Sequence, residues 1–157
     1  MAVTAATLTT TVSESVTLNG KTFGNSITKT HASVKIVREQ IITVPNDALV
    51  TLYEAADSAS GTTFDEDLIV YARITNTDTT NFIGLHFLTT EGDELLYKLN
   101  AGCSFILNAH AGALETETSS GADITEESFN ADADIIKVSA DANTASVDVD
   151  VFIAATG

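Results

Sequence analysis

Three neighbouring carboxylates are the first grouping in this sequence that could do chemistry. Asp65, Glu66 and Asp67 stand side by side, and crowded carboxylates can acquire the unequal proton affinities that general acid and base catalysis needs. Glycine and threonine flank the three acids, however, and carboxylates in such a polar stretch are usually exposed to solvent. We interpret them as surface acids, identify no catalytic residue and expect the protein not to be an enzyme.

A second acidic grouping has the spacing of calcium ligands. Asn130, Asp132 and Asp134 follow one another at intervals of two residues, as the first oxygen ligands of an EF-hand do. The position that requires glycine in that motif is Ile135, so an EF-hand is excluded. A calcium site of another kind is a weaker alternative, although some of the same acids fit the outward face of a strand. The weak candidate ligands are Asp132, Asp134, Asp148 and Asp150.

The histidines and the single cysteine complete the set of reactive side chains. His31, His86 and His110 are far apart and lack the companions of a zinc motif. His86 alternates with apolar residues, which predicts a packed or interface side chain. Cys103 has no Gly-x-Ser-x-Gly context, so we expect a small buried thiol there. These observations predict neither a metal centre nor a cofactor.

Composition limits the remaining classes. The 157 residues (16.4 kDa) are 44% hydrophobic and carry 22 acidic and 7 basic side chains, a net charge of −15. The hydrophobic content excludes an acidic disordered chain, and the charge excludes a nucleic-acid-binding protein. One cysteine cannot form an intrachain disulfide. With no apolar run of 18 residues and no basic, apolar start, we expect neither a membrane span nor a signal peptide.

The charge is uneven along the chain. Residues 1–78 carry nine acidic and five basic side chains (−4), whereas residues 79–157 carry thirteen and two (−11). We therefore expect the carboxy-terminal half to present a solvent-facing or cation-bridged surface and the first half to supply contacts to partners.

The chain is rich in the residues that favour strands. It contains 24 threonines, and β-branched side chains suit a pleated sheet better than a helix. Apolar side chains alternate with Thr and Ser over residues 7–18, which predicts a long strand, or two in line, with one buried and one polar face. Asn19 and Gly20 then give a strong hairpin signal.

The central part predicts a run of short strands. Residues 68–74 and 82–88 are apolar on both alternating faces, so each should be covered on both sides, by a second sheet and by another element or subunit. Strands at 94–99 and 103–107 follow. Valine and isoleucine alternate with Asp and Phe over residues 147–153, which predicts a closing strand. The polar stretches 54–67 and 109–134 are expected to be a surface loop and a long excursion.

These elements indicate one all-β domain. We predict a single β-sandwich spanning residues 1–157, with two sheets, about 8–10 strands, jelly-roll connections and an extended N-terminal strand or arm over about residues 1–20.

Two segments resemble a known group of proteins. Residues 74–83 (ITNTDTTNFI) and 99–107 (LNAGCSFIL) resemble small β-sandwich virion structural proteins of tailed bacteriophages, especially marine phages. The opening ESVTLNG (14–20) and the closing VDVFIA (149–154) agree with this resemblance. The resemblance implies a role in assembly rather than in catalysis. It also implies that the protein is part of the virion, which is assembled in the host cytoplasm.

The resemblance leaves three functions open. The first is a capsid decoration or cement protein that stabilises the head through symmetric contacts with copies of itself, typically as a trimer, and with the major capsid protein or another virion protein. The expected contacts are residues 4–11 and the two-sided strands. The second is a fibre, knob or tail component that contacts a host receptor through residues 54–67 and 109–134. The third is a calcium-dependent carbohydrate-binding module. No direct nucleic-acid or membrane partner is expected.

Overall fold

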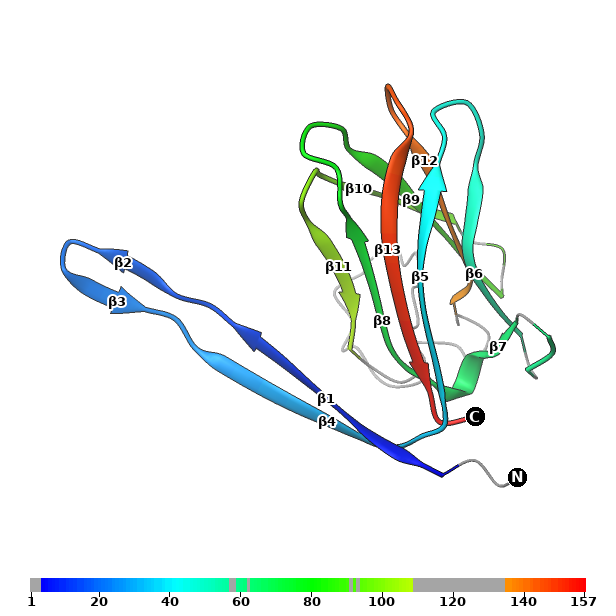
Figure 1. Ribbon diagram of the computed structural model, residues 1–157, viewed down its shortest axis with the longest axis horizontal. Helices are drawn as coiled ribbons and strands as arrows, with labels where there is room; N and C mark the ends of the chain where they lie inside the picture. The colour runs from blue at the N-terminus through cyan, green and yellow to red at the C-terminus, as the bar shows by residue number, and fades with distance from the viewer. Residues whose placement is uncertain (1–3, 57–58, 62, 91, 93, 109–134) are drawn as a thin grey trace, which may run out of the picture.

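The computed structural model describes residues 4–56, 59–61, 63–90, 92, 94–108 and 135–157. Within these residues the chain is all-β, as predicted, with two main sheets of four and five strands that face each other and a long hairpin that projects beside them (Figure 1). The two main sheets contain nine strands, which agrees with the predicted number, and the hairpin contributes four more among the described residues. The architecture is a β-sandwich with an arm.

The four-stranded sheet is antiparallel throughout. Its order is β11 (Ser104–Leu107), β8 (Ile69–Asn76), β13 (Val147–Ala155) and β5 (Ile36–Val44). The last strand of the chain, β13, lies in the middle and pairs with β5 on one side and β8 on the other.

The five-stranded sheet forms the second layer. Its order is β10 (Glu94–Leu99), β9 (Ile83–Thr89), β12 (Ile135–Ala142), β6 (Val50–Ala56) and β7 (Phe64–Asp65). All neighbours are antiparallel except β7, which pairs in parallel with β6 through two residues.

The core lies between the two sheets, where side chains from alternate positions meet. On β13, for example, Val147, Val149, Val151 and Ile153 are all at most 1% exposed, as the alternating pattern predicts. The larger fully buried side chains are Leu52, Phe64, Ile74, Ile83, Leu85, Phe87 and Leu99.

The segment expected to be a surface loop is partly structured. Within residues 54–67, β6 continues to Ala56, β7 adds a short edge strand, and the 3-10 turn η1 (Glu66–Leu68) begins at the end of the segment. Phe64 is buried, with the Arg38 guanidinium 4.5 Å from the centre of its ring. Phe64 therefore attaches this mostly polar segment to the sandwich, which the prediction of a surface loop did not take into account. Residues 109–134, where a long excursion was predicted, lie outside the described part of the chain.

Described strands from the acidic and the less acidic halves of the sequence pair with one another within the sheets. Strand β5 of the first half pairs with β13 of the second, and β6 pairs with β12 in the same way. The sheets therefore combine the two halves, while most of the acids on which the expectation for the carboxy-terminal half depends lie outside the described residues.

A buried asparagine joins the ends of three strands. Asn76, fully buried at the end of β8, donates its side-chain amide to the carbonyls of Asn81 (2.9 Å) and Leu99 (3.2 Å), and its side-chain oxygen accepts the Asp78 N–H (3.0 Å). Its backbone pairs with Cys103 and Gly102 at the start of β11. This network connects the two sequence segments that carry the phage resemblance.

Candidate functional site

The arm is a hairpin built in two stages. Strand β1 (Ala6–Ser13) pairs with β4 (Ser26–Val34), and beyond them β2 (Val16–Leu18) pairs with β3 (Lys21–Phe23). The tip is the predicted Asn19-Gly20 turn, and both residues have positive φ, 51° and 78°. That conformation matches the right-handed twist of the paired strands. Of the arm predicted for residues 1–20, the described residues 4–20 are thus the outgoing half of a hairpin that returns to Val34.

One face of the arm consists of hydroxyl groups. In the β1–β4 ladder, Thr11 lies opposite Thr28, and their hydroxyl oxygens are 3.1 Å apart. In the β2–β3 ladder, Thr17 and Thr22 repeat the arrangement at 3.2 Å. Cross-strand hydroxyl pairs stabilise a ladder while remaining compatible with water.

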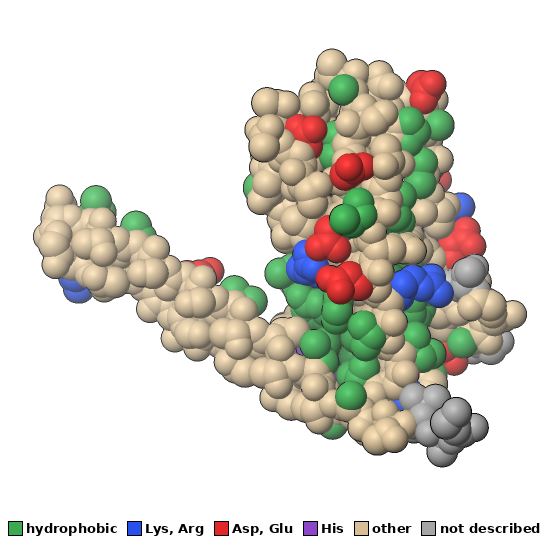
Figure 2. Space-filling model, in the orientation of Figure 1, with side chains coloured by type: hydrophobic (Ala, Val, Ile, Leu, Met, Phe, Trp, Pro, Cys, Tyr) green, Lys and Arg blue, Asp and Glu red, His purple; other side chains and the backbone are tan. Residues whose placement is uncertain are grey.

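The opposite face of the arm is apolar and exposed. Val12 lies opposite Ile27, and Val16 opposite Phe23, with Leu18 next to the tip. Exposure reaches 66% for Ile27 and 62% for Leu18, and hydrophobic side chains stand out along one edge of the arm in Figure 2. The prediction that this face is buried is therefore wrong for the part of the chain that the structure describes, where no strand of the sandwich covers it beyond the base.

An uncovered hairpin of this kind is unfavourable for an isolated chain. Two-stranded hairpins are marginally stable in water, and they become stable when an apolar face packs against something. Each of these side chains would contribute about 1–2 kcal/mol if its exposed part were buried. Burial of this apolar face would therefore stabilise the arm.

The base of the arm is fixed to the sandwich. Leu8 and Val34 pack with Tyr71, Ala154 and Phe152 on the outer face of the four-stranded sheet, where they form a second, smaller apolar cluster. The outer side of β8 is therefore covered by the chain's own arm. This satisfies the prediction that a two-sided strand is covered on both faces and removes that part of β8 from the surfaces available to another subunit.

Two irregularities direct the chain between arm and sandwich. Opposite Thr7, β4 contains one extra residue, and Ser33 there has φ 63°, the mark of a β-bulge. His31, 8% exposed, lies opposite Leu8 next to the bulge. Its Nε2 is 2.8 Å from Asn108 Oδ1, and the centre of its ring is 6.3 Å from that of Tyr71. The bulge turns β4 away from the sheet, and the histidine contact holds its base down.

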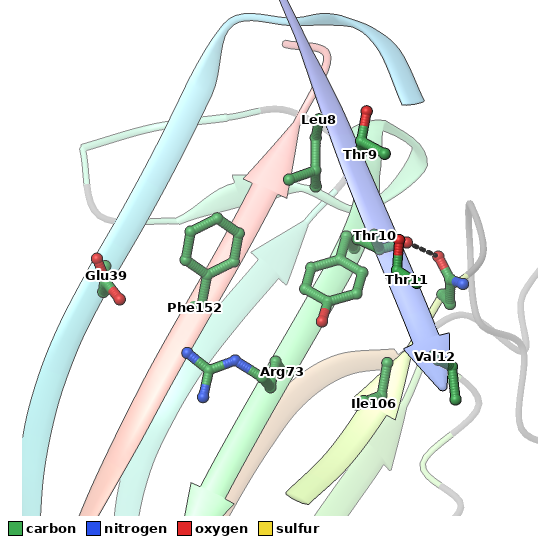
Figure 3. Close-up of a pocket in the computed structure, with 11 residues that line it drawn as sticks. Leu8, Thr9, Thr10, Thr11, Val12, Glu39, Arg73, Ile106 and Phe152 are labelled. Carbon is green, nitrogen blue, oxygen red and sulfur yellow. Dashed lines mark hydrogen bonds between the residues drawn. The ribbon is translucent and has the colours of Figure 1, made fainter. Parts of the chain in front are cut away.

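A groove of about 330 Å³ lies between the base of the arm and the sheet. Leu8 and Val12 line one side, while Phe152 and Ile106 line the other (Figure 3). Its floor includes Arg73 from the centre of the sheet.

Arg73 is held by its own sheet. Its Nη2 lies 2.8 Å from Asp150 Oδ2, and its Nη1 donates to Thr75 Oγ1 (2.6 Å). Both partners face the same side of the sheet as the guanidinium. The groove is therefore lined by apolar and polar side chains in similar number, the polar ones including Glu39 and three threonines, and its guanidinium is already engaged by Asp150 and Thr75.

The predicted calcium ligands are engaged in other contacts where the structure describes them. Asp148 accepts a hydrogen bond from Thr43 Oγ1 (2.6 Å), and Asp150 pairs with Arg73. Asp132 and Asp134 lie outside the described residues. Among the described residues, no group of three or more His, Cys, Asp or Glu side chains is placed to hold a metal ion.

The other reactive side chains have structural surroundings. Cys103 is exposed, which contradicts the predicted buried thiol, because it belongs to the tight turn that precedes β11 and its N–H donates to the Asn100 carbonyl (3.2 Å). His86 is half-buried, with Nε2 3.0 Å from Asp141 Oδ1. Asp65 accepts the Asp67 N–H at the start of η1.

Asp78 is the titratable group with the clearest environment. Its carboxylate accepts the backbone N–H groups of Asn81 (2.7 Å) and Thr80 (2.6 Å), and these bonds lower its pKa from 3.8 to about 2. The side chain closes the turn between β8 and β9, so its perturbed pKa reflects turn structure.

The described part of the chain contains no helix with the length and apolarity to cross a membrane. Nothing matched the chain when it was compared with protein-family models, with curated proteins and with solved structures.

Proposed function

We propose that the chain is a virion structural protein, a decoration or cement protein on the outside of a bacteriophage capsid. The observation that carries this proposal is the arm, because it projects from the sandwich and exposes an apolar face that no described strand of the chain covers, the kind of surface that marks an interaction site. The resemblance of residues 74–83 and 99–107 to phage virion proteins supplies the setting. In the structure these two segments belong to one unit, joined through Asn76, which supports treating them as one shared feature.

We further propose that the sandwich is a jelly roll. The eight longer strands of the sandwich, in chain order, are β5, β6, β8, β9, β10, β11, β12 and β13. The first, eighth, third and sixth of these lie side by side in one sheet, and the second, seventh, fourth and fifth in the other. This distribution supports two interlocked Greek keys, the arrangement that defines a jelly roll.

The charge of the molecule favours the outside of the particle. The sequence has 22 acidic and 7 basic side chains, so its body would be repelled by packaged nucleic acid and well solvated on an outer surface. A cement protein acts by adding interface between capsid subunits, and that interface must break before the shell opens. The proposed partners are copies of the chain, as a trimer, and the major capsid protein.

Copy number on purified particles tests the proposal. A decoration protein is present in hundreds of copies, so quantitative gel densitometry should find it at a ratio to the major capsid protein of order one, and a particle reconstruction should locate it on the head. A few to dozens of copies at the tail would instead favour a fibre or tail component. Absence from the particle would refute a virion role altogether.

A loss-of-protein experiment tests the cement function separately. Particles that lack the chain should release their genome at a lower temperature and after milder osmotic shock than complete particles. Adding back the purified protein should restore both properties. Equal resistance of the two kinds of particle would exclude cementing while leaving decoration intact.

A further inference from the structure

We infer that the arm of one copy packs its apolar face against the outer face of the four-stranded sheet of a second copy. The inference rests on the proposed function in that it supplies the contact between neighbouring decoration subunits. It names both sides of that contact, the face of the arm with Val12, Val16, Leu18, Phe23 and Ile27 and the sheet face with Val37 and Ile41.

The arm is too long to be covered by its own sandwich. From Val34 to the turn at Gly20 it spans 15 residues, about 50 Å at about 3.3 Å per residue, whereas the nine residues of β13 span about 30 Å. The arm leaves the sandwich at its base and runs outward (Figure 1). Its distal strands β2 and β3 pair only with each other among the described strands, so we assign the surface that covers their apolar side chains to another molecule.

The contact at the base continues into the exposed part of the arm. Along β4, Ile27 and Lys29 lie on the same face as His31, which points toward the sheet at Tyr71 and Asn108. The face that packs on the chain's own sheet is therefore the face that becomes exposed further out. One sheet surface covers its beginning, and a second surface of similar composition would cover the rest.

The sheet offers a surface with that composition. On the outer side of β5, Val37, Glu39 and Ile41 alternate, and Ile41 is 71% exposed. Beside them on β13 lie Asp148 and Asp150. Figure 2 shows this face, where hydrophobic patches surround a group of acidic and basic side chains.

The charges of the two surfaces are complementary. Residues 4–34, which make up the arm, carry two lysines and one glutamate, a net charge of +1. On the outer face of the four-stranded sheet, three carboxylates stand against one guanidinium, that of Arg73; they belong to Glu39, Asp148 and Asp150. Both lysines lie on the apolar face, Lys29 opposite Thr10 and Lys21 opposite Leu18. Copies of so acidic a chain repel one another, and the arm is the region that opposes this repulsion. A second copy of this chain, with its apolar and acidic sheet face, is therefore the partner that the arm fits.

Matched variants of the full chain test the arm. Ile27→Glu places a charge on the apolar face, and Thr28→Glu places the same charge on the adjacent residue of the hydroxyl face. Sedimentation velocity over a wide concentration range should show a concentration-dependent oligomer for the wild type and for Thr28→Glu. Ile27→Glu should weaken association by about tenfold or more.

Matched variants on the sandwich test the receiving surface. Ile41→Glu alters the proposed face, and Leu96→Glu alters an equally accessible side chain, 65% exposed, on edge strand β10 of the other sheet. Ile41→Glu should weaken association as much as Ile27→Glu does, while Leu96→Glu should leave it unchanged. Circular dichroism establishes that each variant is folded.

Cross-linking identifies the pair directly. In a Cys103→Ser background, chains with Ile27→Cys are mixed with chains with Ile41→Cys, and mild oxidation should join them into a disulfide-linked dimer. Substitution of Leu96→Cys for Ile41→Cys should give no such product. A wild-type chain that remains monomeric at every concentration overturns the inference, as does an oligomer that tolerates Ile27→Glu or Ile41→Glu.

The inference and the proposed function can fail separately. A monomeric chain that nevertheless coats particles would overturn the self-association and would indicate that the capsid protein covers the arm. An oligomer formed through the predicted surfaces by a chain that is absent from particles would overturn the virion role alone.

Discussion

Gly24→Ala should disrupt the strand pairing at the tip of the arm and leave the rest of the molecule folded. A Cβ at residue 24 would overlap the carbonyl oxygen of Glu14 and lie 2.9 Å from Cα of Ser15, and φ at this position is 143°. The chain must then either accept the strain, about 1–3 kcal/mol, or rotate away. Rotation breaks the hydrogen bond from the Glu14 N–H to the Asn25 carbonyl (2.8 Å), which contributes about 1 kcal/mol.

Either course costs about 1–3 kcal/mol, which matches or exceeds what a marginally stable ladder of three residue pairs can supply by itself. We therefore expect β2 and β3 to lose their pairing in Gly24→Ala while β1, β4 and the sandwich keep theirs. NMR measures this directly, because cross-strand NOEs between Thr17 and Thr22 should disappear while those between Thr11 and Thr28 persist.

Gly20→Ala is the matched control for this substitution. Gly20 also has positive φ, 78°, but nothing lies within 4 Å of a Cβ there, so the cost is limited to about 1 kcal/mol of backbone strain. Its tip NOEs should be weakened less than those of Gly24→Ala. Retention of wild-type NOEs at the tip in Gly24→Ala would refute the argument that this glycine sets the junction of the two ladders.

Three further predictions concern the sandwich and the base of the arm. Asn76→Ala should lower the free energy of unfolding in urea by about 2–4 kcal/mol, because it leaves two carbonyls and one N–H without their partners. The control Asn46→Ala removes one exposed hydrogen bond to the Thr144 carbonyl and should lower it by less than about 1 kcal/mol. Equal losses in the two variants would contradict the role of burial. The pKa of Asp78 is lowered from 3.8 to about 2 in the folded chain, so its carboxylate stabilises the fold fully above pH 4 and loses this effect as the pH falls toward 2. The melting temperature should therefore fall more steeply over this pH range in the wild type than in Asp78→Asn. An equal pH dependence in the two proteins would exclude Asp78 as the source of the effect. Tyr71→Ala should lower the free energy of unfolding by about 3 kcal/mol and release the base of the arm from the sheet. The release should appear as loss of protection from hydrogen exchange in β4. Protection equal to that of the wild type would show that the cluster does not hold the arm.

Local patterns in the sequence predicted the elements that depend on neighbouring residues. The alternation over residues 147–153 corresponds to β13, and the two-residue turn at Asn19 and Gly20 is where it was expected. Such features are determined by side-chain period and turn conformation, which short segments contain in full. The two-sheet architecture followed from the number of strands.

The partner of each strand face depends on distant residues and could not be read in this way. The apolar stripe from Val12 to Leu18 indicated a face that avoids water, but alternation is identical whether the covering surface comes from the same chain or from another. Cys103 was expected to be a buried thiol because it was assigned to a strand and lacks the Gly-x-Ser-x-Gly context of a nucleophile, whereas the turn at Gly102, with φ 69°, directs it outward. Asn76 gave no signal, because a buried asparagine is recognised only from the carbonyls that it meets.

An exposed apolar hairpin also creates a risk of uncontrolled aggregation, and the arm has features that limit it. Its two outer edges expose unpaired backbone groups to which any strand could add. The junction at Gly24 interrupts the ladder, so no long straight edge is presented, and the lysines Lys21 and Lys29 stand on the apolar face itself. Random contacts between arms bring these lysines together, while contact with an acidic sheet face neutralises them. The same charges that oppose arm-to-arm association therefore favour the arm-to-sheet contact, which makes assembly selective as well as favourable.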